Sequence, residues 1–92
     1  MSERNPCYRV RKAVRFRIVD REAVVVRQDS GEVMVLNEVG ARVLVLLAEG
    51  LSPDQIARRI PEEFEVTPEQ ADEDVKLYLN ELMEAGLIEC AP

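Results

Sequence analysis

The sequence predicts an α+β domain in which a three-stranded antiparallel sheet is followed by three helices. Residues 13–36 contain an alternating apolar and polar run followed by two runs rich in β-branched or apolar residues, and turn-forming residues interrupt them twice, as in a meander of short strands. Residues 38–85 carry apolar side chains at helical spacing. Two stretches, "SPDQ" and "TPEQ", each combine a hydroxyl cap, a proline and a glutamine, which is typical of a helix start. This order of elements is that of a winged helix-turn-helix domain.

The three predicted strands are joined by short connections, so each is expected to pair with its neighbour in the chain. The first reads "AVRFRIV", where apolar residues alternate with arginines, and "DRE" turns it into the second, "AVVVR". "QDSG" then turns the chain into the third strand, Glu32 to Leu36. In such a meander the third strand lies at an edge of the sheet. One side of its backbone is therefore left without hydrogen-bond partners.

Each predicted helix begins at a capping residue. Asn37, Ser52 and Thr67 can each accept a hydrogen bond from a backbone N–H of the first helical turn. Gln55 and Gln70 are placed to complete capping boxes with Ser52 and Thr67. The first helix is apolar around more than one face, which predicts a central position in the domain.

Glycine and proline are predicted to end the helices. Gly50 and Gly86 can adopt the left-handed conformation that closes the first and third helices. Pro61 is expected to stop the second helix, which leaves a seven-residue connection up to Thr67. On the third helix Leu77 lies off the apolar stripe that should face the core. That stripe consists of Ala71, Val75, Tyr78, Leu79 and Leu82.

Charge is distributed unevenly along a chain whose net charge is −6. Residues 1–28 carry eight bases and three acids, whereas residues 29–92 carry four bases and fifteen acids. Residues 1–12 are interpreted as a basic N-terminal tail and residues 13–92 as a single domain with one modest core. Because no apolar run suits a membrane span or a signal peptide, the expected location is the cytoplasm, with no membrane partner.

The residue types that usually carry catalysis or bind metal are sparse. The chain has no histidine, and Cys7 and Cys90 stand far apart without a CxxC pair, so reduced thiols are expected instead of a zinc site or a disulfide framework. No nucleophile has a recognisable base beside it, and no glycine-rich loop follows a strand. We therefore expect no enzymatic activity, no cofactor and no metal.

A winged helix-turn-helix fold raises the alternative of a DNA-binding transcriptional regulator. A recognition helix approaches phosphates and normally carries arginine and lysine. The third predicted helix instead carries six acids against Lys76 alone, and Arg58 and Arg59 on the second helix are followed by three acids. The seven-residue connection is also longer than the ~3–4 residues of a tight helix-turn-helix. Nucleic-acid binding is therefore not expected.

The third strand and the third helix together predict a groove for an extended peptide. The strand is apolar on both faces and its edge can pair with another extended chain. Leu77 supplies an apolar side chain on the helix. Two alternatives remain open. Residues 33–36 can simply belong to the core, with Leu77 packed on the tail. Two copies of the chain can also pair edge to edge as a homodimer, so monomer and homodimer are both compatible with the sequence.

In the order and spacing of its caps and core residues, the chain resembles the PqqD family. Members of this family are small proteins that recognise ribosomally made precursor peptides before their modification. The resemblance runs through "VMVLNEVGARVLVLLAEGLSPDQIARRIPEEFEV" and "DVKLYLNELMEAGLIE", and covers roughly residues 14–89. The residues that carry it are mostly caps and core positions. They are Leu36, Asn37, Gly40, Leu44, Gly50, Ile56, Asp74, Val75, Tyr78, Leu79, Leu82, Gly86, Leu87 and Ile88.

The resemblance implies a non-catalytic peptide chaperone that binds the leader of a precursor peptide by adding it to the third strand, against the third helix. The second partner would be a modifying enzyme, such as a radical S-adenosylmethionine protein or a leader protease. PqqD proper often has Cys-Asp-Gly at the end of the first helix, where this chain has "LLAEGLS". Whether the product is pyrroloquinoline quinone or another peptide natural product therefore stays open.

Carried onto this sequence, the resemblance implies peptide contacts on the third strand and on one flank of the third helix. The opposite flank, with Lys76, Leu79 and Met83, is the alternative for the helix. The peptide-binding residues implied by the resemblance are Glu32, Val33, Met34, Val35, Leu36, Asp74, Leu77, Tyr78 and Glu81.

The charge pattern makes a direct prediction about duplex DNA. In a gel-shift assay at low salt, where phosphate contacts are strongest, the chain is expected to leave the duplex unshifted. A salt-sensitive shift that disappears when Arg58 and Arg59 are replaced by glutamine would instead support the DNA-binding alternative.

Overall fold

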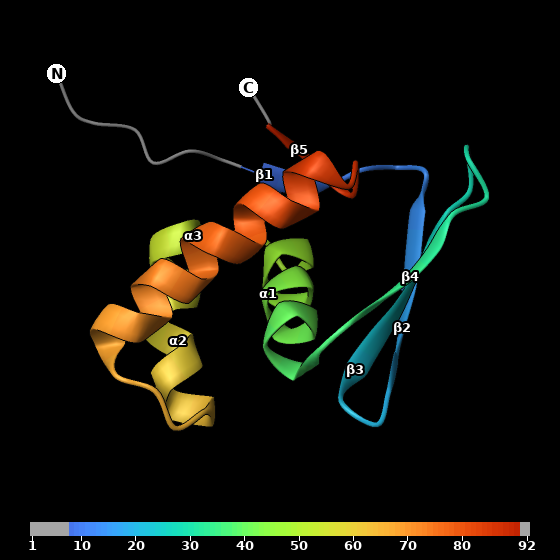
Figure 1. Cartoon of the computed structure of the whole chain (residues 1–92). Helices are drawn as coiled ribbons and strands as arrows, with labels where there is room; N and C mark the ends of the chain where they lie inside the picture. The colour runs from blue at the N-terminus through green and yellow to red at the C-terminus, as the bar shows by residue number, and fades with distance from the viewer. Residues whose placement is uncertain (1–7, 91–92) are drawn as a thin grey trace, which may run out of the picture.

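The structure, a computed structural model, describes residues 8–90 and places a three-stranded antiparallel sheet before three helices, as predicted (Figure 1). The main sheet has the order β2-β3-β4, so β4 is an edge strand. A second sheet of two strands, β1 and β5, joins the two ends of the described chain. The elements are β1 Tyr8–Val10, β2 Val14–Val19, β3 Glu22–Arg27, β4 Val33–Leu36, α1 Glu38–Ala48, α2 Pro53–Glu63, α3 Pro68–Glu84 and β5 Ile88–Cys90.

The main sheet keeps one register across its three strands. Val25 on the central strand lies opposite Phe16 on β2 and Met34 on β4. The turn between β2 and β3 consists of Asp20 and Arg21, whose φ angles are 51° and 71°. Two successive positive φ angles match the twist of the flanking strands in a two-residue hairpin. The turn predicted at residues 20–22 is confirmed at Asp20 and Arg21, whereas Glu22 already belongs to β3.

The N-terminal segment differs from the prediction. Residues 8–10 form β1, which pairs antiparallel with β5 and places Tyr8 opposite Cys90. The prediction of a tail through residue 12 is therefore wrong for these residues. A strand of three residues is too short to show a period of two in the sequence, and its partner strand lies about eighty positions away. The Arg9–Glu89 ion pair, at 2.7 Å, joins the two strands. Cys90 is a free, exposed thiol, whereas residues 1–7 of the predicted tail, Cys7 among them, lie outside the described residues.

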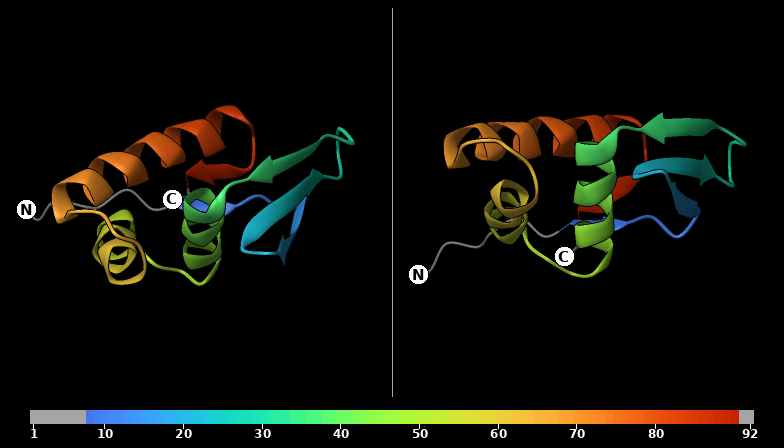
Figure 2. Two further views of the ribbon diagram at one scale, coloured as in Figure 1. Left: turned by 60° about the horizontal axis from the view of Figure 1, so that its bottom comes forward. Right: turned by 90° about the horizontal axis from the view of Figure 1, so that it is seen from below.

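The core lies around α1, which stands between the main sheet and the pair formed by α2 and α3 (Figure 2). Val43, Leu44 and Leu46 on α1 are completely buried, as its apolar circumference predicted. A helix that is apolar on more than one face must be covered on several sides. The main sheet covers one face of α1, and α2 and α3 cover its other apolar faces. None of the helices formed by residues 8–90 is long and apolar enough to cross a membrane.

The helix caps are confirmed with one exception. Asn37 Oδ1 accepts from Gly40 N at 2.9 Å, and Ser52 and Gln55 form the complete capping box. The Thr67 hydroxyl also accepts from the backbone N–H of Gln70, at 3.1 Å. The Gln70 side chain, however, donates to Asp74 Oδ1 at 2.9 Å. The box predicted at the start of α3 is thus only half formed.

The end of α2 also differs from the prediction. The helix continues through Pro61 to Glu63. Proline fits helical φ, although it removes the hydrogen bond that residue 61 would donate to Ala57 O and its ring crowds that carbonyl. The complete burial of Ile60 holds this last turn against the core. Only residues 64–67 then separate α2 from α3. Connection length therefore no longer argues against a helix-turn-helix, whereas the acidity of α3 still argues against DNA binding.

Candidate functional site

The free edge of β4 exposes a defined set of backbone groups. In an antiparallel pair, residues that exchange hydrogen bonds alternate with residues that do not. Arg27 N donates to Glu32 O at 2.9 Å, so the bonded positions on this side of the sheet recur at every second residue from Glu32. The N–H and C=O groups of Val33 and Val35 therefore point away from β3, toward the open edge. These are the groups to which another extended chain can bond.

The side chains of β4 alternate between the two faces of the sheet. Met34 and Leu36 are half-buried against the core, whereas the exposed fractions of Val33 and Val35 are 62% and 60%. Glu32 was predicted to open this strand, but it lies in the turn before it, where its N–H donates to Ser30 Oγ at 3.3 Å. The predicted strand is confirmed over 33–36 only.

Of the three strands in the main sheet, β4 lies nearest to α3 (Figure 2). Two contacts beside the ends of this strand reach α3 or its C-cap. At the end that leads into α1, Asn37 Nδ2 lies 2.8 Å from the Tyr78 hydroxyl, and the hydroxyl lies 3.0 Å from Asn37 Oδ1. Beside the other end, Arg27 of β3, which pairs with Glu32 just before β4, donates from Nη1 to the carbonyl oxygen of Ala85, the C-cap of α3, at 3.3 Å. The strand edge and the C-terminal half of α3 are thus held beside each other at two points.

The orientation of Tyr78 decides which flank of α3 faces β4. Residues three or four positions apart lie on the same side of a helix, so Asp74, Glu81 and Ala85 share the flank of Tyr78. On the opposite flank Lys76 pairs with Asp72 at 3.0 Å. Leu79, assigned to that opposite flank as an alternative contact, is 6% exposed and belongs to the core. The flank toward β4 is the one that carries Asp74, Tyr78 and Glu81.

The four helix residues implied as contacts occupy different places on this flank. Glu81 is exposed and lies one turn from both Tyr78 and Ala85, between the two points where α3 meets the strand. Tyr78 is half-buried and its hydroxyl is bonded to Asn37, so its side chain is fixed between α3 and the end of β4. Asp74 lies one turn earlier, beyond the end of β4. Leu77, at 55% exposure, lies at the outer rim of the flank.

Arg27 was not predicted as a site residue, yet its guanidinium connects the β3–β4 turn to the end of α3. Beside its bond to Ala85 O, Nη1 lies 3.3 Å from Glu32 Oε1 and Nη2 lies 3.4 Å from Asp29 Oδ2. Nε lies 3.4 Å from Asp29 Oδ1 but is buried without a hydrogen bond. Gly86 has a φ of 76°, which favours glycine, and a Cβ there would lie 2.7 Å from Nη1 and displace the guanidinium. No local sequence signal joins residues that lie 58 positions apart.

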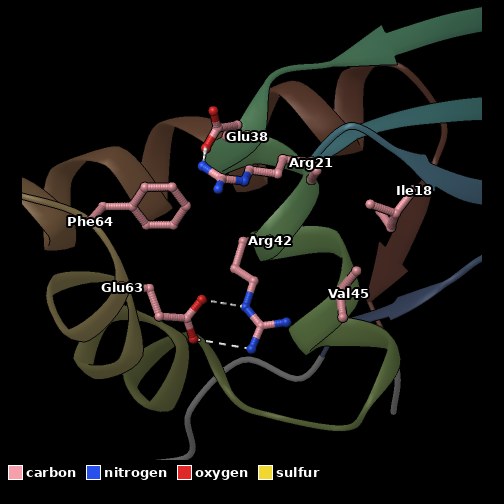
Figure 3. A pocket seen from close by; sticks show the side chains of 8 residues that line it. Ile18, Arg21, Glu38, Arg42, Val45, Glu63 and Phe64 are labelled. Atoms are coloured by element: carbon pink, nitrogen blue, oxygen red, sulfur yellow. Dashed lines mark hydrogen bonds and ion pairs between the residues drawn. The ribbon is translucent and has the colours of Figure 1, made fainter.

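Away from the β4 edge, a hollow of about 440 Å³ lies between the β2–β3 hairpin, α1 and the end of α2 (Figure 3). Its charged side chains form two ion pairs, Arg42–Glu63 at 2.6 Å and Arg21–Glu38 at 3.8 Å. Each carboxylate there has a guanidinium partner, so neither is placed as a free general base. The apolar lining consists of Ile18, Ala41, Val45 and Phe64. Within residues 8–90 no group of three or more metal-ligating side chains gathers.

The fold and this edge define a class, the small α+β domains that keep one strand open beside a helix. Within that class the chain belongs to the PqqD family: the family described as "Coenzyme PQQ synthesis protein D (PqqD)" matches residues 22–88, from β3 to the start of β5. The resemblance stated from the sequence is confirmed. No curated protein is similar enough to this chain to count as a match.

Two solved structures share the fold. One is described as "TbiB1 in Complex with the TbiA(beta) Leader Peptide"; it is 30% identical, with a TM-score of 0.82, over 88% of this chain and 94% of that one. The other is described as "Lasso peptide synthetase B1 complexed with the leader peptide"; it is 28% identical, with a TM-score of 0.81, over 90% of this chain and 98% of that one. Both similarities extend over nearly the whole domain.

The Asn37–Tyr78 contact is expected to contribute measurably to stability. Tyr78→Phe removes the hydroxyl and should lower the free energy of unfolding by about 0.5–1.5 kcal/mol. Asn37→Ala also removes the cap of α1 and should lower it by about 1–3 kcal/mol. Asn37→Ser keeps a capping oxygen and should resemble Tyr78→Phe. Urea unfolding measures each value. Full additivity in the Asn37→Ser/Tyr78→Phe double variant would contradict a direct contribution from this bond.

The Arg27–Asp29 contact predicts an acid-sensitive turn. The side-chain hydrogen bond from Arg27 holds the pKa of the Asp29 carboxyl below its ordinary value. A lowered folded pKa means that the stabilisation is complete above the unfolded value of about 3.9 and is lost as pH falls through the folded value. Carboxyl ¹³C titration should record the low pKa and its return toward the unfolded value in Arg27→Met. Arg17→Met, which changes a distant arginine, should leave the Asp29 pKa in place.

Proposed function

We propose that this chain is a non-catalytic recognition domain for the leader of a ribosomally made precursor peptide. The observation that carries the proposal is the free edge of β4, held beside α3, in a PqqD-family chain whose two structural relatives are described in complex with leader peptides. No finding favours the DNA-binding alternative. The acids of α3 would repel phosphates but do not obstruct a peptide.

Strand addition accounts for how such a domain could bind a flexible partner. The outward N–H and C=O groups of Val33 and Val35 supply main-chain hydrogen bonds that do not depend on the peptide's sequence. Selectivity would come from side chains that alternate along the added strand, half of them directed toward Met34, Leu36 and the flank of α3. In this arrangement Tyr78 is a wall of the groove and Glu81 is its exposed polar contact. Glu32, held by Arg27, lies at the end where the peptide strand would begin or finish.

The proposed role is presentation of the peptide, with the chemistry performed by another protein. The carboxylates around the hollow beside α1 are paired with arginines, and the groove itself offers backbone groups and a tyrosine whose hydroxyl is bonded. A radical S-adenosylmethionine protein or a leader protease is the kind of enzyme that would receive the leader. Its place of action would be the cytoplasm, where ribosomes release the precursor.

A titration followed by NMR tests the groove. Isotope-labelled chain is mixed with the leader of a precursor peptide encoded beside it. Amide shifts are expected to move at residues 33–36 and around Tyr78 and Glu81. Shifts confined to α2 or to Tyr8–Val10 would contradict the proposed groove.

A proline substitution distinguishes the contribution of the β4 backbone to leader binding from that of the side chain. Val35→Pro removes an N–H that points away from β3, so the pairing between β3 and β4 should persist. Loss of one hydrogen bond, with the peptide acceptor left unpaired, should weaken leader binding by about 1–2 kcal/mol, roughly five- to thirty-fold.

Val35→Ala is the matched control, because it shortens the same side chain and keeps the N–H. Isothermal calorimetry should find the proline variant clearly weaker than the alanine variant. Equal affinities in two folded variants would argue against strand addition at β4.

A further inference from the structure

The outer face of the main sheet is left uncovered by the rest of the described chain. All three helices lie on the same side of β2, β3 and β4 (Figures 1 and 2). Side chains alternate along a strand, so the residues next to Val25 on β3 and next to Met34 on β4 point to the side of the sheet away from the core. On β3 these are Val24 and Val26, which are half-buried, and on β4 they are Val33 and Val35, which are mostly exposed. We call these four residues the valine face.

Two parallel rows on the outer face cross all three strands of the main sheet. Val24 lies between Arg17 on β2 and Val35 on β4. Val26 lies between Arg15 on β2 and Val33 on β4. Each row therefore reads arginine, valine, valine from one edge of the sheet to the other. The result is an apolar strip of four valines with a basic column along one side and the free edge of β4 along the other.

The basic column is not neutralised within the part of the chain that the structure describes. Other arginines of residues 8–90, among them Arg9, Arg27 and Arg42, lie within ion-pair distance of a carboxylate. Neither Arg15 nor Arg17 does so, and Arg15 Nη1 is bonded only to backbone oxygens, at 2.8 and 3.0 Å. The register also sets Glu22, opposite Val19, on this face, but its carboxylate lies within ion-pair distance of neither arginine. Two unpaired guanidinium groups thus border the valines in a chain whose net charge is −6. A partner with carboxylates would complement them.

An apolar strip bordered by unpaired charge has the composition of a protein interface, with an apolar centre and a polar rim. We propose that the valine face, together with Arg15 and Arg17, docks the peptide-modifying enzyme through an apolar patch bordered by carboxylates. This inference rests on the proposed function for the identity of the partner. The arginines would contribute mainly to the rate and specificity of encounter, and the valines to the buried area.

The geometry allows the enzyme and the leader to bind together. Leader pairing uses N–H and C=O groups in the plane of the sheet, whereas the valine side chains stand perpendicular to that plane. An added leader strand would become the next strand beside β4, so its outward side chains would continue the two rows. An enzyme docked on the valine face would then meet the recognition domain and part of its peptide on one surface. Docking is thus expected to be tighter when the leader is present.

The test uses the purified peptide-modifying enzyme encoded beside this chain, immobilised, with the full chain in solution. Arg17→Glu and, separately, Val24→Thr are expected to weaken docking at least tenfold. Both positions lie off the β4 edge, so affinity for the leader should stay within twofold of the wild type. Arg58→Glu is the matched control, since it makes the same charge change on an exposed arginine of α2, and it should dock as the wild type does.

The possible outcomes separate this inference from the proposed function. Wild-type chain that fails to dock, or Arg17→Glu and Val24→Thr variants that dock as tightly as the wild type, would overturn the valine face as the enzyme site. Sedimentation that finds these variants changed only in self-association would assign the face to a second copy of the chain and overturn the inference too. Docking that depends on both residues, in a chain that binds no leader, would uphold the surface and refute leader recognition.

Discussion

The arrangement of strand and helix depends on Asn37, which makes two side-chain contacts and also links β4 to α1. Its Oδ1 caps α1 through Gly40 N, its side chain meets the Tyr78 hydroxyl, and its backbone carries the chain out of β4. The Tyr78 ring in turn lies so close to Gly40 that a Cβ there would approach it to 3.0 Å. A single amide therefore sets the start of the central helix, the end of the edge strand and the distance between that strand and α3. Because these features share one residue, the open edge is a fixed part of the fold.

Local sequence patterns predicted most of the fold because each helix or strand is specified by residues close together in the chain. The alternation around Phe16, the caps at Ser52 and Thr67 and the glycine after α1 all act within one turn or one strand pair. Sequence reasoning failed where a distant contact decides the outcome. Burial of Ile60 carries α2 through a proline, and β1 exists only because the chain returns to pair with it.

The candidate site was predictable in its parts but not in its assembly. The apolar edge strand and the acidic helix were visible in the sequence, as was a family resemblance that covers both. Which flank of α3 faces the strand depends on the Asn37–Tyr78 contact, across 41 positions, and the Arg27–Ala85 contact spans 58. The arginine and valine rows likewise appear only when three strands are set in register. Periodicity indicates which residues share a face, but not what lies opposite them.

The pairing of Tyr8 with Cys90 has a mechanical consequence. The described chain enters and leaves the domain at the same spot, on two antiparallel strands whose outermost residues are partners. Tension applied to polypeptide attached at both ends would pull those partners directly apart and open β1 from β5 one bond at a time. The load would pass first to α1 and the core, because Tyr8 and Val10 of β1 pack against the core and Ile88 of β5 is buried in it. The free edge of β4 belongs to the other sheet and lies further along this path.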